Sequence, residues 1–382
     1  MTIKTIKRGL PLVAFALALA GFASRSVVNS QDDKPVEQVK KNIQVLKGMP
    51  DSQLRPLMNY FNAALGVRCN FCHTMKDGRI DFVSDEHEHK GIARKMIKMV
   101  QDTNKNSFDG KNTISCFTCH QGRGIPAAVP TFPLAAPLGP APGPRPPAPG
   151  APAATPPPGP PPAPPSAESV WDKYVQAVGG KEAAAKLKTR TLKGTFTNGG
   201  NNQTMNAEVK FAAPGKLLTT MMMTTPDGQA AEMVSATDGT SGFAKDPRGT
   251  RALNPIELND IKVLADSLNA VKLSEPYPKL MNGRGMRINE RATTVLRFEQ
   301  NQTRTALFFD AETGLLLRRI DTLTNFLGAI PQQYDFEDYK EVDGVKLPMT
   351  VRISSVDSGI TGTWKFTEVK HNVALDGVKF TQ

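Results

Sequence analysis

Two short strings hold all four cysteines of the chain, and in each a histidine directly follows the second cysteine. They are Cys69-Asn70-Phe71-Cys72-His73 and Cys116-Phe117-Thr118-Cys119-His120. C-x-x-C-H is the pattern at which haem c is attached: the two thiols form thioethers with the haem vinyl groups, and the histidine binds the iron. The sequence therefore predicts two covalently attached haems and one-electron chemistry at their irons.

Four cysteines could instead form two disulfides, or one zinc site with four thiolate ligands. The two C-x-x-C pairs of a zinc ribbon are usually separated by about 15–20 residues, whereas 43 residues lie between Cys72 and Cys116. A thioredoxin-like redox pair needs a surrounding βαβ pattern, which is not found here. None of these sites requires a histidine after both pairs, so the spacing favours haem.

The beginning of the chain has the layout of a secretory signal peptide. Lys4, Lys7 and Arg8 are followed by an uncharged apolar run from Leu10 to Ala23. We therefore expect residues 1–23 to be a signal peptide and the mature protein to lie in the periplasm, which agrees with haem attachment outside the cytoplasm. The run is shorter than the ~20 residues of a comfortable membrane span. No stable span is expected after cleavage, and an uncleaved N-terminal anchor is the alternative.

The formal net charge of +11 does not indicate a nucleic-acid partner. Basic residues are scattered, aromatic residues make up only 7% of the chain, and no nucleic-acid-binding motif is present. The expected partners are redox proteins of the envelope, and a modest basic face would suit an acidic one.

Residues 126–166 separate two parts of different composition. Nineteen of these 41 residues are proline, which removes the amide donor and fixes φ, so neither a helix nor a central strand can form. We expect an extended, polyproline-rich linker. A chain of 382 residues suits two domains, and the linker places them at residues 24–125 and 167–382.

The first domain has helical periodicity ahead of each C-x-x-C-H string. One apolar stripe is formed by Leu54, Leu57, Met58, Phe61 and Leu65, and Gly66 is placed to end that helix. A second stripe, with an inward face, is formed by Ile92, Met96, Met99 and Val100. The pattern predicts an all-α dihaem domain built from two helix-then-attachment units.

The second domain has strand patterns separated by turn signals. They predict an α+β fold with a curved antiparallel sheet. The expected strands are 190–197, 205–211, 216–224, 293–299, 303–309, 315–320, 349–353 and 363–369, and the expected helices are 168–178, 182–187 and 255–271.

Each haem iron also needs a sixth ligand for simple electron transfer, and methionine can serve. Met58 lies 11 residues before Cys69, whereas Met96 and Met99 lie 20 and 17 residues before Cys116. Spacing alone leaves Met96 and Met99 as alternatives, since methionine is also a common core filler. Bis-histidine ligation would have to use His87 or His89, in a charged stretch expected to be exposed. His371 is expected on the surface of the second domain.

Residues 40–124 resemble the cytochrome c subunit of photosynthetic reaction centres. The matching positions are Leu57-Met58, Leu65-Gly66, both C-x-x-C-H strings, residues 93–99, Asn104 and Gln121-Gly122. The resemblance implies that Met58 is the sixth ligand opposite His73, that Met96 is the sixth ligand opposite His120, and that Met99 is a packing residue. Members carry four haem motifs and this chain has two, so the resemblance extends to a dihaem unit and not to photosynthesis.

Residues 309–316 and 339–348 resemble envelope domains of the lipoprotein-carrier type. Those domains are curved antiparallel half-barrels closed by helices, so the resemblance implies an apolar-ligand pocket in residues 167–382. A domain that binds a partner protein, or that only positions the cytochrome, is the alternative. No catalytic constellation is recognisable there.

These observations favour an exported dihaem cytochrome that transfers single electrons between envelope proteins. Two alternatives remain. A dihaem oxidoreductase such as a peroxidase would need one open iron and a distal acid–base group, for which His89 or Glu88 could be nominated. An apolar-ligand carrier with accessory haems is the other. Enzymatic activity is therefore left open.

Overall fold

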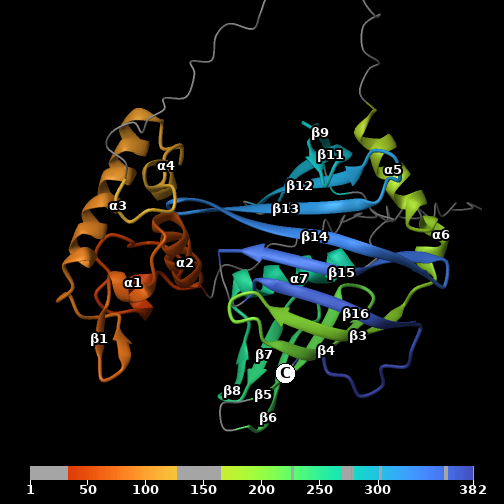
Figure 1. The fold of residues 1–382 in the computed structure, drawn as a ribbon. Helices are drawn as coiled ribbons and strands as arrows, with labels where there is room; N and C mark the ends of the chain where they lie inside the picture. The colour runs from red at the N-terminus through yellow and green to blue at the C-terminus, as the bar shows by residue number, and fades with distance from the viewer. Residues whose placement is uncertain are drawn as a thin grey trace, which may run out of the picture.

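The computed structural model describes residues 33–126, 165–224, 228–268, 277, 279–300, 303–356 and 360–381. The predicted signal peptide (1–23) and residues 127–164 of the predicted linker lie outside the described residues. We call residues 33–126 the motif segment and residues 165–381 the sheet region. The motif segment, red to gold in Figure 1, lies beside the edge of the green and blue sheet region.

The motif segment is mainly helical and also contains a short hairpin that the all-α prediction did not include. Asp77-Gly78 between β1 and β2 is a typical hairpin turn sequence, but strands of three residues are too short to show alternation. The elements of this segment are α1 (Val36–Val39), η2 (Asp51–Gln53), α2 (Leu54–Leu65), η3 (Cys69–Phe71), β1 (Thr74–Lys76), β2 (Arg79–Asp81), α3 (Glu88–Ser107) and α4 (Cys116–His120).

Gly66 ends α2, as the sequence predicted, and joins the two attachment strings. Its φ of 67° is left-handed, and a Cβ at this position would lie 2.1 Å from the carbonyl oxygen of Gly122. Only glycine tolerates both conditions. The Gly122 amide donates a hydrogen bond to the Ala64 carbonyl at 2.8 Å. The end of α2 is therefore held against the turn that follows the second C-x-x-C-H string.

The sheet region is built around one large antiparallel sheet. Its strand order is β10-β11-β12-β13-β14-β15-β16-β3-β4-β5-β6-β7-β8, with β9 paired to β11. The last strand, β16, pairs with β3, the first strand of the sheet region, so the two ends of this part of the chain meet inside the sheet. The helices are α5 (Ala167–Ala177), α6 (Gly180–Ala185) and α7 (Pro255–Leu268). The strands are β3 (Thr189–Asn198), β4 (Thr204–Ala212), β5 (Lys216–Thr224), β6 (Ala230–Thr237), β7 (Gly242–Asp246), β8 (Gly249–Ala252), β9 (Met281–Gly283), β10 (Arg287–Ile288), β11 (Arg291–Gln300), β12 (Thr303–Asp310), β13 (Leu316–Asn325), β14 (Gly328–Val342), β15 (Val345–Ser355) and β16 (Gly362–His371).

The curved antiparallel sheet predicted from the sequence is confirmed, and every expected strand overlaps an observed one. The longest strand, β14, was missed. Its alternation of buried Tyr334 and Phe336 stops at Asp338, which has a φ of 57° and is skipped in the pairing with β15. The register with β15 is the same on both sides of this residue, at Glu337 with Thr350 and at Tyr339 with Pro348. Asp338 itself is exposed where the alternation expects a buried residue, so a period of two does not describe the whole strand.

Helices α5 and α7 cover the apolar face of the sheet. Trp171 and Val175 of α5 join one buried cluster with Leu258, Ile261 and Leu264 of α7. The inward residues of β3, β4, β12 and β15 belong to the same cluster. Among the described residues, this face is thus packed by helices that belong to the chain itself.

Candidate functional site

A cavity of about 2080 Å³ lies between the motif segment and the sheet region. This volume is about twice the upper end of the ~300–1,000 Å³ typical of a pocket for one small ligand. Most of its wall comes from the motif segment, and α7 and the turn between β6 and β7 complete it. Seven of the predicted site residues line it: Met58, Cys69, Cys72, His73, Met96, Cys116 and His120.

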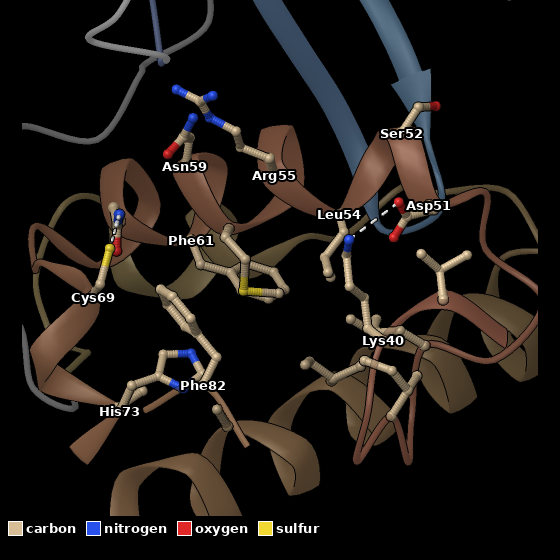
Figure 2. Close-up of a pocket in the computed structure, with 18 of the residues that line it drawn as sticks. Lys40, Asp51, Ser52, Leu54, Arg55, Asn59, Phe61, Cys69, His73 and Phe82 are labelled. Atoms are coloured by element: carbon tan, nitrogen blue, oxygen red, sulfur yellow. Dashed lines mark hydrogen bonds and ion pairs between the residues drawn. The ribbon is translucent and has the colours of Figure 1, made fainter. Parts of the chain in front are cut away.

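The first attachment string folds into a tight turn at the cavity wall. The amides of Cys72 and His73 both donate to the Cys69 carbonyl, at 3.2 and 3.0 Å. Figure 2 shows the His73, Phe61 and Phe82 rings facing the same space, with Cys69 at its edge. This turn therefore presents two thiols and an imidazole to one cavity, as covalent haem attachment requires.

The His73 ring makes an edge-to-face contact with the ring of Phe82. Its ring centroid lies 5.0 Å from that of Phe82, at 73° between the planes. Burial, and then the nearby charge of Lys90, lower the pKa of His73. Its buried Nδ1 has no hydrogen-bond partner within the described residues. The neutral imidazole favoured here is the form that binds iron.

The second string forms the short helix α4. Ser115 and Thr118 form a capping box at its start, and Gln121 ends it with a φ of 48°. The His120 Nδ1–H donates to the Arg123 carbonyl at 2.9 Å. This bond selects the tautomer whose Nε2 is unprotonated and available to a metal. His120 is therefore oriented by the turn that follows its own helix.

The four cysteines are unequal in their surroundings. All four are free of disulfide bonds, and Cys119 is exposed and outside the cavity wall. Burial raises the pKa of the Cys72 and Cys116 thiols. Within the described residues, no group of three or more His, Cys, Asp or Glu side chains is gathered into a metal-ion site. In the described part of the chain, the four thiols are thus neither paired with one another nor gathered into one cluster.

The methionines of α3 are placed differently from the prediction. Met96 and Met99 were expected on the inward face, but they are 39% and 46% exposed. The buried face of α3 is formed by Lys90, Ile97, Val100 and Asn104 instead. Because successive helical residues are about 100° apart, Met96 lies at the flank of this face and Met99 lies nearly on the opposite side of the helix. Met96 still lines the cavity and Met99 does not. On α2, Met58 lines the cavity and packs on the core of the motif segment.

His89 is closer to the first attachment string than the sequence suggested. It was expected to be exposed, but it lines the cavity and stacks on Phe71, with centroids 4.3 Å apart and 7° between the planes. Its Nδ1–H donates to the Phe71 carbonyl at 3.0 Å. His87 lies against His89, at 5.2 Å between centroids, and its Nδ1 is buried. Only the tertiary fold brings this pair to the string, so no local signal could have identified it.

Basic side chains dominate the charged part of the cavity wall. Two acidic residues, Asp33 and Asp51, line it beside eight basic ones: Lys34, Lys40, Lys41, Arg55, Arg68, Lys90, Arg94 and Lys262. Haem carries carboxylate propionates, which such a wall can balance. Together with the thiols, imidazoles, methionines, apolar side chains and volume, the basic wall fits haem c.

Asn104 fixes the loop that leads into the second string, a role that the sequence did not reveal. This residue is 4% exposed. Its Oδ1 accepts hydrogen bonds from the amides of Thr113 and Ile114, at 3.1 and 3.0 Å. Its Nδ2 donates to the Ile114 carbonyl at 2.8 Å.

Replacing Asn104 by leucine should lower the free energy of unfolding by about 2–4 kcal/mol, since three hydrogen bonds are lost and buried backbone groups remain unpaired. Urea unfolding followed by circular dichroism measures the change. Asn106→Leu, at an exposed position of the same helix, is the control and should change stability by less than about 0.5 kcal/mol. Equal effects of the two substitutions would contradict this role.

His371 lies in the sheet region, away from the cavity, and its side chain is only 1% exposed rather than on the surface as expected. Its Nδ1 lies 3.0 Å from Asp343 Oδ2. Burial, and then the charge of Arg190, lower the pKa of His371, although Asp343 opposes them.

The pKa of a histidine in the unfolded chain is about 6.5, and the pKa of His371 in the folded protein is lower. At pH values between the two, the unfolded state therefore binds more protons than the folded state. Stability of the sheet region should therefore fall as the pH drops below about 6.5. Tryptophan fluorescence during urea unfolding at several pH values measures this, because Trp171 and Trp364 both belong to the sheet region. His371→Gln should flatten the dependence. An unchanged slope in that variant would rule His371 out as its source.

Comparison with known proteins places both attachment strings within a segment of cytochrome c type. Residues 18–134 match the sequence model of the family described as photosynthetic reaction centre cytochrome C subunit. Cytochrome c-554 of Chloroflexus aurantiacus is 38% identical over 86 residues, 21% of this chain and 20% of the relative. The photosynthetic reaction center cytochrome c subunit of Roseobacter denitrificans is 26% identical over 102 residues, 24% of this chain and 27% of the relative. The chain thus matches only about a fifth to about a quarter of the length of these relatives.

Solved structures similar to the C-terminal part are lipoprotein-carrier-like domains. One is a putative outer membrane lipoprotein-sorting protein domain from Vibrio parahaemolyticus, at 11% identity and a TM-score of 0.35, covering 55% of this chain and 95% of that one. Another is a LolA superfamily protein from Nitrosomonas europaea, at 10% identity and a TM-score of 0.36, covering 57% and 99%. The resemblance predicted for residues 40–124 is confirmed by the family match over residues 18–134, and the names of these solved structures agree with the resemblance predicted for the second domain. None of the helices in the described part of the chain has the length and hydropathy of a membrane span.

Proposed function

We propose that the chain is an exported dihaem c-type cytochrome that relays single electrons between redox proteins of the cell envelope. The observation that carries this proposal is the single cavity lined by both attachment strings, by both of their histidines and by one methionine from each preceding helix. Haem bound there would supply one-electron chemistry at iron.

In this proposal the side chains divide the work of holding two haems. Cys69 with Cys72, and Cys116 with Cys119, form the covalent attachments. His73 and His120 would each hold one iron through Nε2, and the hydrogen bond from His120 to Arg123 fixes the orientation of the second imidazole. These assignments follow from the C-x-x-C-H pattern.

Met58 and Met96 would supply the second protein ligand to each iron. The position of Met96 on the cavity wall, with Met99 outside it, supports the choice between the two methionines of α3. A methionine thioether raises the reduction potential relative to a second histidine. Filled coordination on both faces suits electron transfer, since no iron position is then open to a substrate.

Export to the periplasm is part of the same proposal. The basic start and the apolar run over residues 10–23 support it, as does the requirement for haem attachment outside the cytoplasm. The partners would be envelope redox proteins. An apolar ligand for the sheet region has less support, because α5 and α7 pack the apolar face of the described sheet.

A dihaem oxidoreductase is the second candidate, and one observation favours keeping it. His89 lines the cavity with its Nδ1 already bonded to the Phe71 carbonyl. Its Nε2 could serve as an acid–base group near the first haem. This function would require one iron without a sixth protein ligand.

The two functions differ in spin state and in reaction with peroxide. For the electron carrier we expect the purified, exported protein to be fully low-spin, with methionine–iron charge-transfer absorption in the ferric state and no rapid reaction with hydrogen peroxide. A high-spin haem that reacts rapidly with peroxide would instead support the oxidoreductase. His89→Leu should abolish that reaction in the second case and have no effect in the first.

A further inference from the structure

One hairpin of the sheet region leaves the sheet and contacts the motif segment. Strands β13 and β14 remain paired up to Asn325 and Gly328, so Phe326 and Leu327 form the tip. The neighbouring strand β12 pairs with β13 only as far as Leu323. In Figure 1 the two blue strands run past the rest of the sheet to the side of α2.

The hairpin tip is part of the core beneath α2. Leu327 is 1% exposed and Ile330 is 8% exposed. Both belong to one buried cluster whose other members come from the motif segment: Val36, Leu46, Met49, Leu57, Tyr60, Ala64 and Ile97. Two predicted haem-site residues, Met58 and Cys116, pack against this cluster. Leu327 therefore supports the helix that carries Met58.

A second contact closes the cavity itself. Thr240 and Ser241, in the turn between β6 and β7, line the cavity. Asn254, just before α7, and Lys262, in the middle of α7, line it as well. Helix α7 also lies against η2. The sheet region thus contacts the motif segment in two places: in the wall of the cavity and in the core beneath α2.

These wall elements are held rigidly by their own hydrogen bonds. Asp238 Oδ1 accepts from the amides of Thr240 and Ser241, both at 2.7 Å. At α7, Asn254 Oδ1 accepts from the Ile256 and Glu257 amides at 3.0 Å, and Glu257 accepts from the Asn254 amide at 3.1 Å. This reciprocal pair is a capping box. The wall is therefore preformed by the sheet region.

We propose that the sheet region is a positioning element of the haem site, with Leu327 as the residue that holds α2 and Met58 against the cavity. The proposal rests on the proposed function in taking Met58 as an iron ligand. It assigns the second half of the chain a role within the molecule, beyond recognition of a separate ligand or partner.

The physical basis is the packing of one leucine in a core formed by both parts. A smaller or charged side chain at this position leaves a cavity or a buried charge beneath α2. The helix then loses its support on the side that faces the hairpin, and the bond between Met58 and iron becomes easier to break. Solvent access to the haem also increases, which tends to change its reduction potential.

Unfolding followed with two probes tests whether the two parts form one unit. Haem absorbance reports on the motif segment, and fluorescence of Trp171 and Trp364 reports on the sheet region. In the full-length holoprotein we expect coincident urea transitions. Leu327→Asp should shift the haem transition to lower urea, and Phe326→Asp, at the neighbouring tip residue that is 38% exposed, should leave it in place. Separate transitions in the wild type, with a haem transition insensitive to Leu327→Asp, would overturn the proposal.

Ligand exchange tests the positioning of Met58 directly, and it uses Leu327→Ala in case the aspartate variant does not fold. Imidazole must displace the methionine to bind the ferric iron. It should bind at least ~10-fold more tightly to Leu327→Ala than to the wild type, because large-to-small core substitutions exceed the energy of a tenfold change. Equal imidazole affinity in the two proteins would show that Leu327 is only structural.

A colourless protein would contradict the proposed function without deciding the role of Leu327. In that case the alkylation rate of Cys116, which packs against the same cluster, replaces the haem signal. Faster alkylation in Leu327→Ala than in Phe326→Ala would support the contact, and equal rates would overturn it.

Discussion

Replacing Met58 by alanine should convert one of the two haems to high spin and remove about half of the methionine–iron charge-transfer absorption, since one of two iron–thioether bonds is lost. Met58 is the methionine of α2, and it lines the cavity and packs on the core shared with the hairpin tip. Alanine leaves no sulfur within reach of the iron opposite His73. Ferric absorption and electron paramagnetic resonance spectra measure the change.

Met96→Ala should have the same effect on the other haem, and Met99→Ala is the matched control on the same helix. Met99 does not line the cavity, so its removal should leave both signals intact. An unchanged spectrum in either Met58→Ala or Met96→Ala would refute that ligand assignment. Capture of the vacated iron by His89 would give a low-spin haem without the methionine band, and Met58→Ala/His89→Leu distinguishes that outcome.

Removing both cysteines of one string should remove one haem. We expect Cys116→Ala/Cys119→Ala to bind half as much covalent haem per chain as the wild type, because thioether bonds can no longer form at α4. The haem content of denatured protein, from which non-covalent haem has been extracted, measures this. Cys69→Ala/Cys72→Ala is the reciprocal variant and should give the same value.

Loss of both haems in one variant would indicate that haem attachment at one string depends on the other string. The hydrogen bond between the Gly122 amide and the Ala64 carbonyl is a contact that could couple them. Retention of both haems in either double variant would contradict the assignment of the strings as attachment sites.

Local features of the sequence predicted most of the elements that carry the site. The helix over α2 follows from its apolar stripe, and its end follows from a left-handed glycine at position 66. The strand from Lys216 to Thr224 agrees with the prediction at both ends. The C-x-x-C-H strings identify the chemistry because the thioether and iron bonds need those residues within five consecutive positions. Such information is contained in short windows of sequence.

The parts that were not predicted depend on contacts between distant residues. The position of Leu327 in the core of the motif segment joins residues more than 200 positions apart, and no periodicity encodes such a contact. His89 reaches Phe71 only through the turn of the chain between them. The apolar stripe of α3 predicted that Met96 and Met99 face inward. The stripe does not show where the buried face ends, so the exposure of both side chains was predicted wrongly. In strand β14 the left-handed Asp338 interrupts the alternation of buried residues.

The intact mass of the exported protein tests the central claim most directly. The chain should be expressed in a host that matures c-type cytochromes, purified, denatured and treated with a thiol-alkylating reagent before mass spectrometry. We predict the mass of the processed chain plus two haems, with none of the four cysteines alkylated. A colourless chain of unmodified mass, in which all four cysteines react, would contradict the account.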